Sequence, residues 1–140
     1  MKSGTTSTKL EDIRHHWHLI DLKNQIVGRI ATRIANLLMG KSKPYFVHHL
    51  DCGDYVVAIN ASFVKVTGKK AEQKLYGHFS GYPGGLKEKS FKQVLLEDPK
   101  RIINQAVSGM LPKNKLHDSM LKRFFVFTDE KHPYGDKFNK

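Results

Sequence analysis

Cysteine is almost absent from the sequence, and long apolar runs are missing altogether. Cys52 is the single cysteine among 140 residues, so no disulfide can form within the chain. This composition excludes a disulfide-stabilised secreted domain and suits a reducing compartment. No apolar run approaches the roughly 18 residues that a membrane helix needs, so we expect no membrane partner. Residues 1–14 also lack the apolar segment of a secretory signal, and we expect them to form a flexible arm.

The motifs of common enzyme classes are missing too. Gly68 precedes a lysine, but a phosphate-binding loop needs a glycine where Phe63 stands and a Ser or Thr where Lys70 stands. The glycines between Gly77 and Gly85 do not follow the G-x-G-x-x-G spacing of a dinucleotide site. Neither a G-x-S-x-G elbow nor an H-E-x-x-H helix occurs. The sequence therefore predicts a protein that is not an enzyme and has no small-molecule substrate.

Metal-capable side chains gather in one segment, from His48 to Asp54. A structural zinc site usually takes four ligands with two or more cysteines, and this chain has one cysteine. A cysteine nucleophile with a nearby histidine, His48 or His49, is the other chemical interpretation. However, a free cysteine next to a core strand is usually a small apolar residue. We predict no catalytic residue, metal site or cofactor here.

Positive charge is what the sequence has in excess. Lysine and arginine number 24 against 13 aspartate and glutamate, which gives a net charge of +11 and a pI of about 9.8. Excess charge of one sign costs stability through self-repulsion, so its presence points to a polyanionic partner. The alternative is a soluble protein that is basic without functional consequence.

Short apolar segments predict the strands. Tyr55–Ile59 is apolar throughout, which is typical of a strand buried on both faces in the middle of a parallel sheet. Asn60 follows this strand. We expect its side chain to accept hydrogen bonds from free backbone amides and so to start a turn or helix. Trp17–Asp21 and Phe124–Phe127 are the other strand candidates.

Apolar spacing and capping residues predict the helices. Apolar residues recur at helical spacing from Ile26 to Met39, and Gly40 stands where a left-handed cap belongs. Ser90 and Gln93 form a capping box that starts a second helix. The predicted third helix takes Asp98 as its cap, Pro99 at its first position and Gly109 as its end, and a fourth, short helix contains Leu116 and Met120.

Two segments between these elements have weaker patterns. Residues 64–76 alternate around Gly68 and predict a hairpin-like excursion with a basic tip. Gly77–Gly85 holds too many glycines for a regular element. Strands separated by helices predict one α/β domain over residues 15–127, with a small, mainly parallel sheet covered on both sides. Residues 128–140 form a C-terminal tail without periodicity.

Basic residues concentrate where the predicted elements end, and aromatic rings are interleaved with them. Cations attract phosphates regardless of sequence, and planar rings stack on exposed bases. No basic recognition helix stands out, so structured RNA fits better than duplex DNA. The arginines on the first helix are either solvated or part of a phosphate-binding edge. The candidate RNA-binding residues are Arg29, Arg33, Lys41, Lys43, Lys69, Lys70, Lys74, Tyr76, His78, Tyr82, Lys87, Lys113, Lys115 and Arg123.

Several of these segments together resemble one family. The stretch from Val107 to Leu116, which reads Val-Ser-Gly-Met-Leu-Pro-Lys-Asn-Lys-Leu, is similar to a motif of the large-subunit ribosomal protein thirteen family. Other segments match that family in the same order. They are Val27–Ala31, Gly40–Pro44, Asp51–Val57 with Asn60, Val66–Lys70 and Tyr82–Gly85.

The resemblance implies a three-layer α/β/α domain embedded in ribosomal RNA of the large subunit, next to other ribosomal proteins and active early in subunit assembly. The motifs are of the bacterial or organellar type. Bacterial members usually end in a histidine- and alanine-rich tail, from which the segment Glu130–Asp136 departs. Without a clear targeting arm, the bacterial cytoplasm is favoured over an organelle such as the mitochondrion.

Two further functions are open from the residues alone. One is an α/β enzyme that uses its glycine-rich loop to bind a nucleotide or phosphate ester, which nucleotide binding or turnover by the isolated protein would reveal. The other is a regulator that binds its own messenger RNA, which exclusive recovery with that message would reveal.

Overall fold

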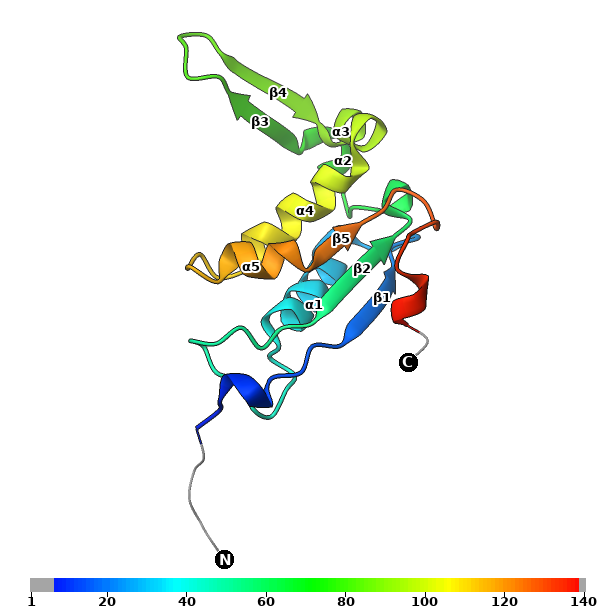
Figure 1. Cartoon of the computed structure of the whole chain (residues 1–140). Coiled ribbons are helices and arrows are strands. Elements are labelled where there is room, and N and C mark those ends of the chain that lie inside the picture. The colour runs from blue at the N-terminus through cyan, green and yellow to red at the C-terminus, as the bar shows by residue number, and fades with distance from the viewer. Residues whose placement is uncertain (1–6, 139–140) are drawn as a thin grey trace, which may run out of the picture.

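A three-stranded parallel sheet lies at the centre of the computed structural model, which describes residues 7–138 (Figure 1). Its strands are β1 (Trp17–Asp21), β2 (Tyr55–Ile59) and β5 (Phe124–Val126), in the order β1-β2-β5. Trp17 pairs with Tyr55, and Val56 pairs with Phe124. The predicted central strand is confirmed, because residues 56–59 of β2 are buried.

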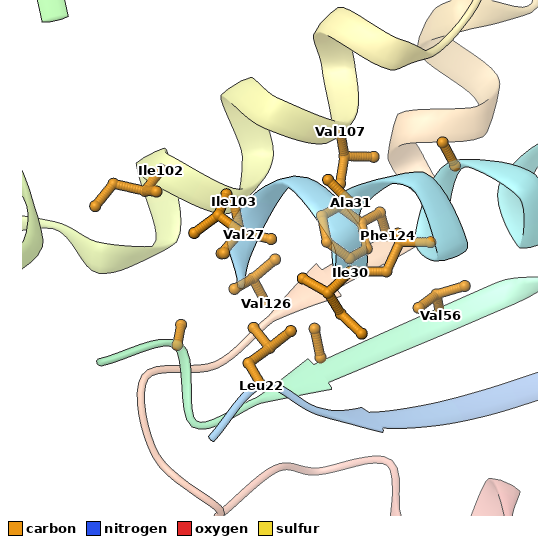
Figure 2. Close-up of a cluster of buried hydrophobic side chains, with 14 of the residues drawn as sticks. Leu22, Val27, Ile30, Ala31, Val56, Ile102, Ile103, Val107, Phe124 and Val126 are labelled. Carbon is orange, nitrogen blue, oxygen red and sulfur yellow. The ribbon is translucent and has the colours of Figure 1, made fainter. Parts of the chain in front are cut away.

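Helices α1 (Val27–Met39) and α4 (Pro99–Met110) pack on one face of this sheet. Figure 2 shows Ile103 of α4 next to Val27 of α1 and Val107 next to Ala31, with Val56 and Val126 of the sheet pointing towards α1. The first helix ends as predicted, because Gly40 adopts the left-handed conformation with φ of 76° and its N–H donates to the Asn36 carbonyl.

The opposite face of the sheet is covered by the C-terminal segment. Trp17 stacks on Tyr55 with ring centroids 4.4 Å apart, and Tyr134 lies 4.7 Å from the ring of Phe125. The segment continues through the 3₁₀ helix η3 (Gly135–Lys137) to Phe138, whose ring meets Trp17 edge-on. The fold is thus the predicted α/β class with three layers. The third layer is short and largely aromatic.

Shorter elements complete the described chain. They are the 3₁₀ helices η1 (Leu10–Asp12) and η2 (Ala61–Phe63), the helices α2 (Lys70–Gln73), α3 (Phe91–Glu97) and α5 (His117–Lys122), and the strands β3 (Leu75–Phe79) and β4 (Leu86–Ser90). The strands β3 and β4 pair antiparallel and project from the α2–α3 end of the body (Figure 1).

The position of this hairpin corrects the prediction for residues 64–85. No hairpin forms around Gly68, because Lys65 bridges to Ile26 and residues 70–73 form α2. The hairpin comes later, with the glycine-rich stretch at its tip. Gly81 and Gly84 take positive φ values of 87° and 74° in the turn, whereas Gly77 lies within β3. Glycine richness therefore marked a tight turn between two strands.

Capping predictions were partly confirmed. The Ser90–Gln93 box is present, since the Ser90 N–H donates to Gln93 Oε1 at 2.9 Å and the Gln93 N–H donates to Ser90 Oγ at 3.4 Å. Pro99 occupies the start of α4, but Asp98 makes no side-chain cap and the helix continues past Gly109 to Met110.

The prediction for Asn60 was wrong in its detail. Its backbone is left-handed with φ of 60°, and the 3₁₀ helix η2 follows it. However, its side chain caps nothing. The amide instead donates to Asp21 Oδ1 at 2.9 Å, which ties the ends of β1 and β2 together.

The expected N-terminal arm and C-terminal tail are partly outside the described residues, namely at residues 1–6 and 139–140. The described part of the arm contains η1, and Thr8 Oγ1 donates to the Tyr45 carbonyl at 2.9 Å. Between residues 7 and 138, no helix combines the length and the apolar character that crossing a bilayer requires.

Candidate nucleic-acid interface

The side chain of Lys43 is largely buried, although the sequence predicts it to contact RNA. Its side chain is only 9% exposed, and Nζ lies 2.5 Å from Asp54 Oδ1. The ammonium also donates to the carbonyl oxygens of Arg14 at 2.5 Å and Cys52 at 2.8 Å. With its donors used in this way, Lys43 holds three chain segments together and is removed from the set of phosphate contacts.

Asp54 is the centre of this buried ionic cluster. Burial alone would raise the pKa of its carboxyl. Hydrogen bonds from the His16 N–H, the Lys43 ammonium and the His18 ring outweigh that effect and hold the pKa of Asp54 below its ordinary value. Asp54 is therefore a stable carboxylate that anchors the start of β1 and β2.

Arg123 is also buried, so the prediction that it contacts RNA is wrong as well. Its guanidinium forms a two-point ion pair with Asp51, with Nη2 lying 2.5 Å from Oδ1, and donates to the Leu38 carbonyl at 3.2 Å. The residue is 8% exposed. Through these contacts with Asp51 and Leu38, Arg123 fixes the loop before β2 against α1. Its charge is neutralised inside the protein.

Tyr76 is the third predicted RNA-binding residue that the structure places in the interior. The prediction of base stacking by Tyr76 conflicts with its position, since only 5% of it is exposed and its side chain belongs to the core with Phe91 and Val94. Burial raises the pKa of its hydroxyl against the opposing field of Arg101. Tyr76 therefore fastens the base of the hairpin to the body.

Two distant loops meet to form the first candidate surface, which we call the loop pocket. This cavity of about 230 Å³ is lined by Lys41, Phe46 and His48 from one loop and by Pro112 and Asn114 from another. The neighbours of Asn114 in the chain, Lys113 and Lys115, are exposed. Tertiary structure thus brings three predicted contacts, at positions 41, 113 and 115, to one side of the molecule.

The second surface, the α1–α2–α4 cluster, surrounds another cavity of about 230 Å³. Gly28, Thr67, Lys70, Lys74 and Met110 are among its lining residues. Arg29 and Arg33 lie within α1 and Lys69 directly precedes α2, and all three are exposed.

The hairpin presents the last predicted residues. His78 and Lys87 pair directly across β3 and β4 and are exposed, and Tyr82 at the tip is 76% exposed. Ion pairs among the described residues use His18, Lys43, Lys89, Lys92, His117 and Arg123. The cations of the loop pocket and the α1–α2–α4 cluster are not among them, so they can meet phosphates.

A groove on α4 was not predicted from the sequence. It has a volume of about 640 Å³ and is lined by Arg101, Asn104, Gln105 and Ser108, with Leu121 and Phe124 alongside and the Asp98 carboxylate at the start of the helix. These four polar residues form the stripe opposite the apolar stripe of the helix. Their spacing was visible in the sequence, but nothing in it distinguished this stripe from an ordinary solvated helix face.

The structure separates the environments of the metal-capable side chains between His48 and Asp54. Cys52 is fully buried, whereas His48 lines the loop pocket and His49 is exposed. Within residues 7–138, no three His, Cys, Asp or Glu side chains gather in a way that could hold a metal ion.

Comparison with known proteins shows the family of this chain. The ribosomal protein L13 family profile matches residues 15–133. The large ribosomal subunit protein uL13 of Solibacter usitatus is 53% identical over 123 residues, which cover 88% of this chain and 86% of that protein. The uL13 proteins of Thermotoga maritima and Prochlorococcus marinus are each 48% identical, over 93% and 94% of this chain and 87% and 92% of their own length. The chain therefore belongs to the ribosomal protein L13 family, whose members are structural proteins and not enzymes.

Proposed function

We propose that this chain is a structural component of the large ribosomal subunit, that it binds large-subunit ribosomal RNA through its exposed basic loops, and that it supports early subunit assembly. Its relatives are named as large ribosomal subunit proteins and come from bacteria. The corresponding location for this chain is the ribosome of a bacterial cytoplasm, beside neighbouring ribosomal proteins.

The observation that supports RNA binding is the division of the charges. Lys43 and Arg123 are buried and paired with carboxylates inside the body. The cations at the loop pocket and the α1–α2–α4 cluster are exposed. A net charge of +11 concentrated on such surfaces attracts a polyanion at long range and binds phosphates at contact.

The shape of these surfaces favours folded RNA over a duplex. Loops and a protruding hairpin suit the irregular backbone of structured RNA. The groove on α4 adds two amides, Asn104 and Gln105, which can both donate to and accept from bases or sugar hydroxyls. We include these two residues and Arg101 in the proposed interface.

Crosslinking within purified large subunits, mapped to individual residues, tests this function. We expect RNA crosslinks at Lys41, Lys70 and Lys113. Exclusive recovery of the chain with messenger RNA, and its absence from large subunits, would favour a regulator of its own message and contradict the proposal.

A matched pair of variants measures the contribution of the loop pocket. Lys41→Ala with Lys113→Ala removes two proposed phosphate contacts and is expected to reduce the slope of log affinity against log salt by about two. Lys92→Ala is the control, because the Lys92 ammonium already lies 3.1 Å from Glu72. Equal effects of the double variant and the control would contradict an interface at the loop pocket.

A further inference from the structure

The β3–β4 hairpin has two chemically different faces. Residues that pair directly across an antiparallel ladder share a face, and successive residues alternate between faces. Tyr76 pairs with Lys89, and His78 pairs with Lys87, so these four residues lie on one face. Gly77 pairs with Glu88, and Phe79 pairs with Leu86, on the other face, together with Leu75.

The first face belongs to the proposed RNA-binding surface. At its base Tyr76 packs into the core, while Lys87 and His78 towards the tip are exposed. Lys89 on the same face pairs with Glu97 at the end of α3. This face therefore combines cations with a planar ring and can meet a phosphate backbone without electrostatic penalty.

The second face is apolar and exposed. Leu75, Phe79 and Leu86 are 55%, 62% and 60% exposed. A Cβ built at Gly77 would lie 3.7 Å from the Leu86 Cδ1, so the Leu86 side chain leans over that glycine and extends the patch along the strand. Exposed apolar side chains grouped in this way mark an interaction site, whereas single ones need no explanation.

Charge on the second face argues against RNA as its occupant. The face holds no lysine or arginine, and its only charged side chain is the carboxylate of Glu88. The Glu88 carboxylate would repel phosphates there, whereas other surfaces of the chain carry many cations. A second copy of the chain fits no better, since each copy has a net charge of +11 and would bring the same carboxylate and no cation to the contact.

We propose that the apolar face of the hairpin, formed by Leu75, Phe79, Leu86 and Glu88, docks a neighbouring protein of the large subunit through apolar side chains and a lysine or arginine that pairs with Glu88. The hairpin then lies between RNA on one face and protein on the other. This inference rests on the proposed function, since the partner is a component of the same subunit.

Site-specific photocrosslinking in purified large subunits tests the division of faces. A benzophenone side chain replaces Phe79 or Leu86 on the apolar face and Lys87 on the opposite face, in otherwise complete chains. We expect Phe79 and Leu86 to yield crosslinks to one and the same protein, and Lys87 to yield crosslinks to RNA. All three positions are exposed, so the substitutions leave the core unchanged.

A second measurement asks whether the contact depends on apolar character and on charge. With the probe at Leu75, Phe79→Ser combined with Leu86→Ser is expected to reduce the protein crosslink at least about tenfold, because apolar anchors dominate such contacts. Glu88→Arg is expected to reduce it as well, whereas Leu96→Ser, which removes an exposed apolar side chain on α3 outside both faces, is expected to leave it unchanged.

Specific outcomes overturn the inference. They are RNA crosslinks from Phe79 equal to those from Lys87, a crosslink between two copies of the chain, or no crosslink from Phe79 and Leu86 in subunits that contain the chain stoichiometrically. Absence of the chain from the subunits is a separate result, which overturns the proposed function and the inference together.

Discussion

Lys43 and Asp54 connect three segments that are distant in the sequence. The Lys43 ammonium pairs with Asp54 at the start of β2 and donates to the Arg14 carbonyl, while Asp54 accepts from the His16 N–H and the His18 ring. Two charges are costly to bury, and they remain stable only when each finds several partners. At the scale of single residues, this cluster fixes the N-terminal segment to the sheet.

Replacing Lys43 by methionine should therefore destabilise the fold. The variant keeps much of the side-chain volume but leaves Asp54 buried without its counter-charge, and we expect a loss of about 3 kcal/mol. Urea denaturation followed by circular dichroism measures the change. Lys41→Met, two positions away on the exposed surface, is the control and should change stability by less than about 0.5 kcal/mol. Similar stabilities of the two variants would show that Lys43 is not a structural residue.

The lowered pKa of Asp54 predicts a dependence of stability on pH. A carboxyl whose pKa is lower in the folded than in the unfolded chain adds stability that is complete above the unfolded pKa of 3.8. That stability is lost as the pH falls through the lower, folded pKa.

The test compares the wild-type chain with Asp54→Asn by urea denaturation between about pH 6 and pH 3. We expect the wild-type chain to be more stable at the upper end and the difference to shrink towards the lower end. Asp21, whose pKa is lowered mainly by the Asn60 amide, is present in both chains and cancels. A difference that stays constant over this range would contradict the role of Asp54.

At the scale of elements, the close approach of two segments decides how β2 meets α1. Gly53 precedes β2 and passes directly against the C-terminal end of α1. A Cβ at this position would collide with the Leu38 carbonyl and would lie 2.6 Å from the Arg123 guanidinium. Only a residue without a side chain allows the strand, the helix end and the Arg123–Asp51 pair to occupy this space together.

Gly53→Ala should consequently destabilise the protein by about 2–3 kcal/mol, the cost of overpacking a well-filled region. Gly28→Ala is the matched control, because a Cβ there meets nothing within 4 Å and alanine is favoured over glycine in a helix such as α1. Melting temperatures of both variants provide the comparison. A Gly53→Ala protein as stable as the Gly28→Ala protein would contradict the packing described for this crossing.

At the scale of the whole molecule, a tightly packed body presents its surplus positive charge at loops and at the hairpin. The layers are fixed by α1, α4 and the aromatic C-terminal segment on either side of the sheet. The described residues contain no group of acidic or histidine ligands that would bind a metal. A rigid basic body of this kind suits a protein that binds folded RNA and neutralises its phosphate charges.

The affinity for large-subunit ribosomal RNA should therefore be strongly salt-dependent. With some 6–10 phosphate contacts, we expect affinity to fall by about 10³–10⁵ between 50 and 200 mM salt. Filter binding or fluorescence anisotropy with a ribosomal RNA fragment measures this dependence. A loss smaller than about tenfold over the same range would contradict phosphate neutralisation as the basis of binding.

The sequence by itself determined the three strands of the parallel sheet, the main helices and most of their ends, but not the strands β3 and β4. Tyr55–Ile59, the helix ending at Gly40 and the Ser90–Gln93 box all match the structure. These features depend on periodicity and on contacts between residues a few positions apart, which a linear pattern records. The net charge and the positions of the basic residues along the chain were also visible in the sequence.

Tertiary structure alone decided which charges remain available for a partner. Lys43 reaches Arg14 across 29 positions and Arg123 reaches Asp51 across 72, so no local pattern could show that both are buried. The pairing that gives the β3–β4 hairpin its two faces, and the convergence of the loops at positions 41 and 113, arise in the same way. Burial and adjacency depend on contacts between segments far apart in the chain, and the folded structure establishes those contacts.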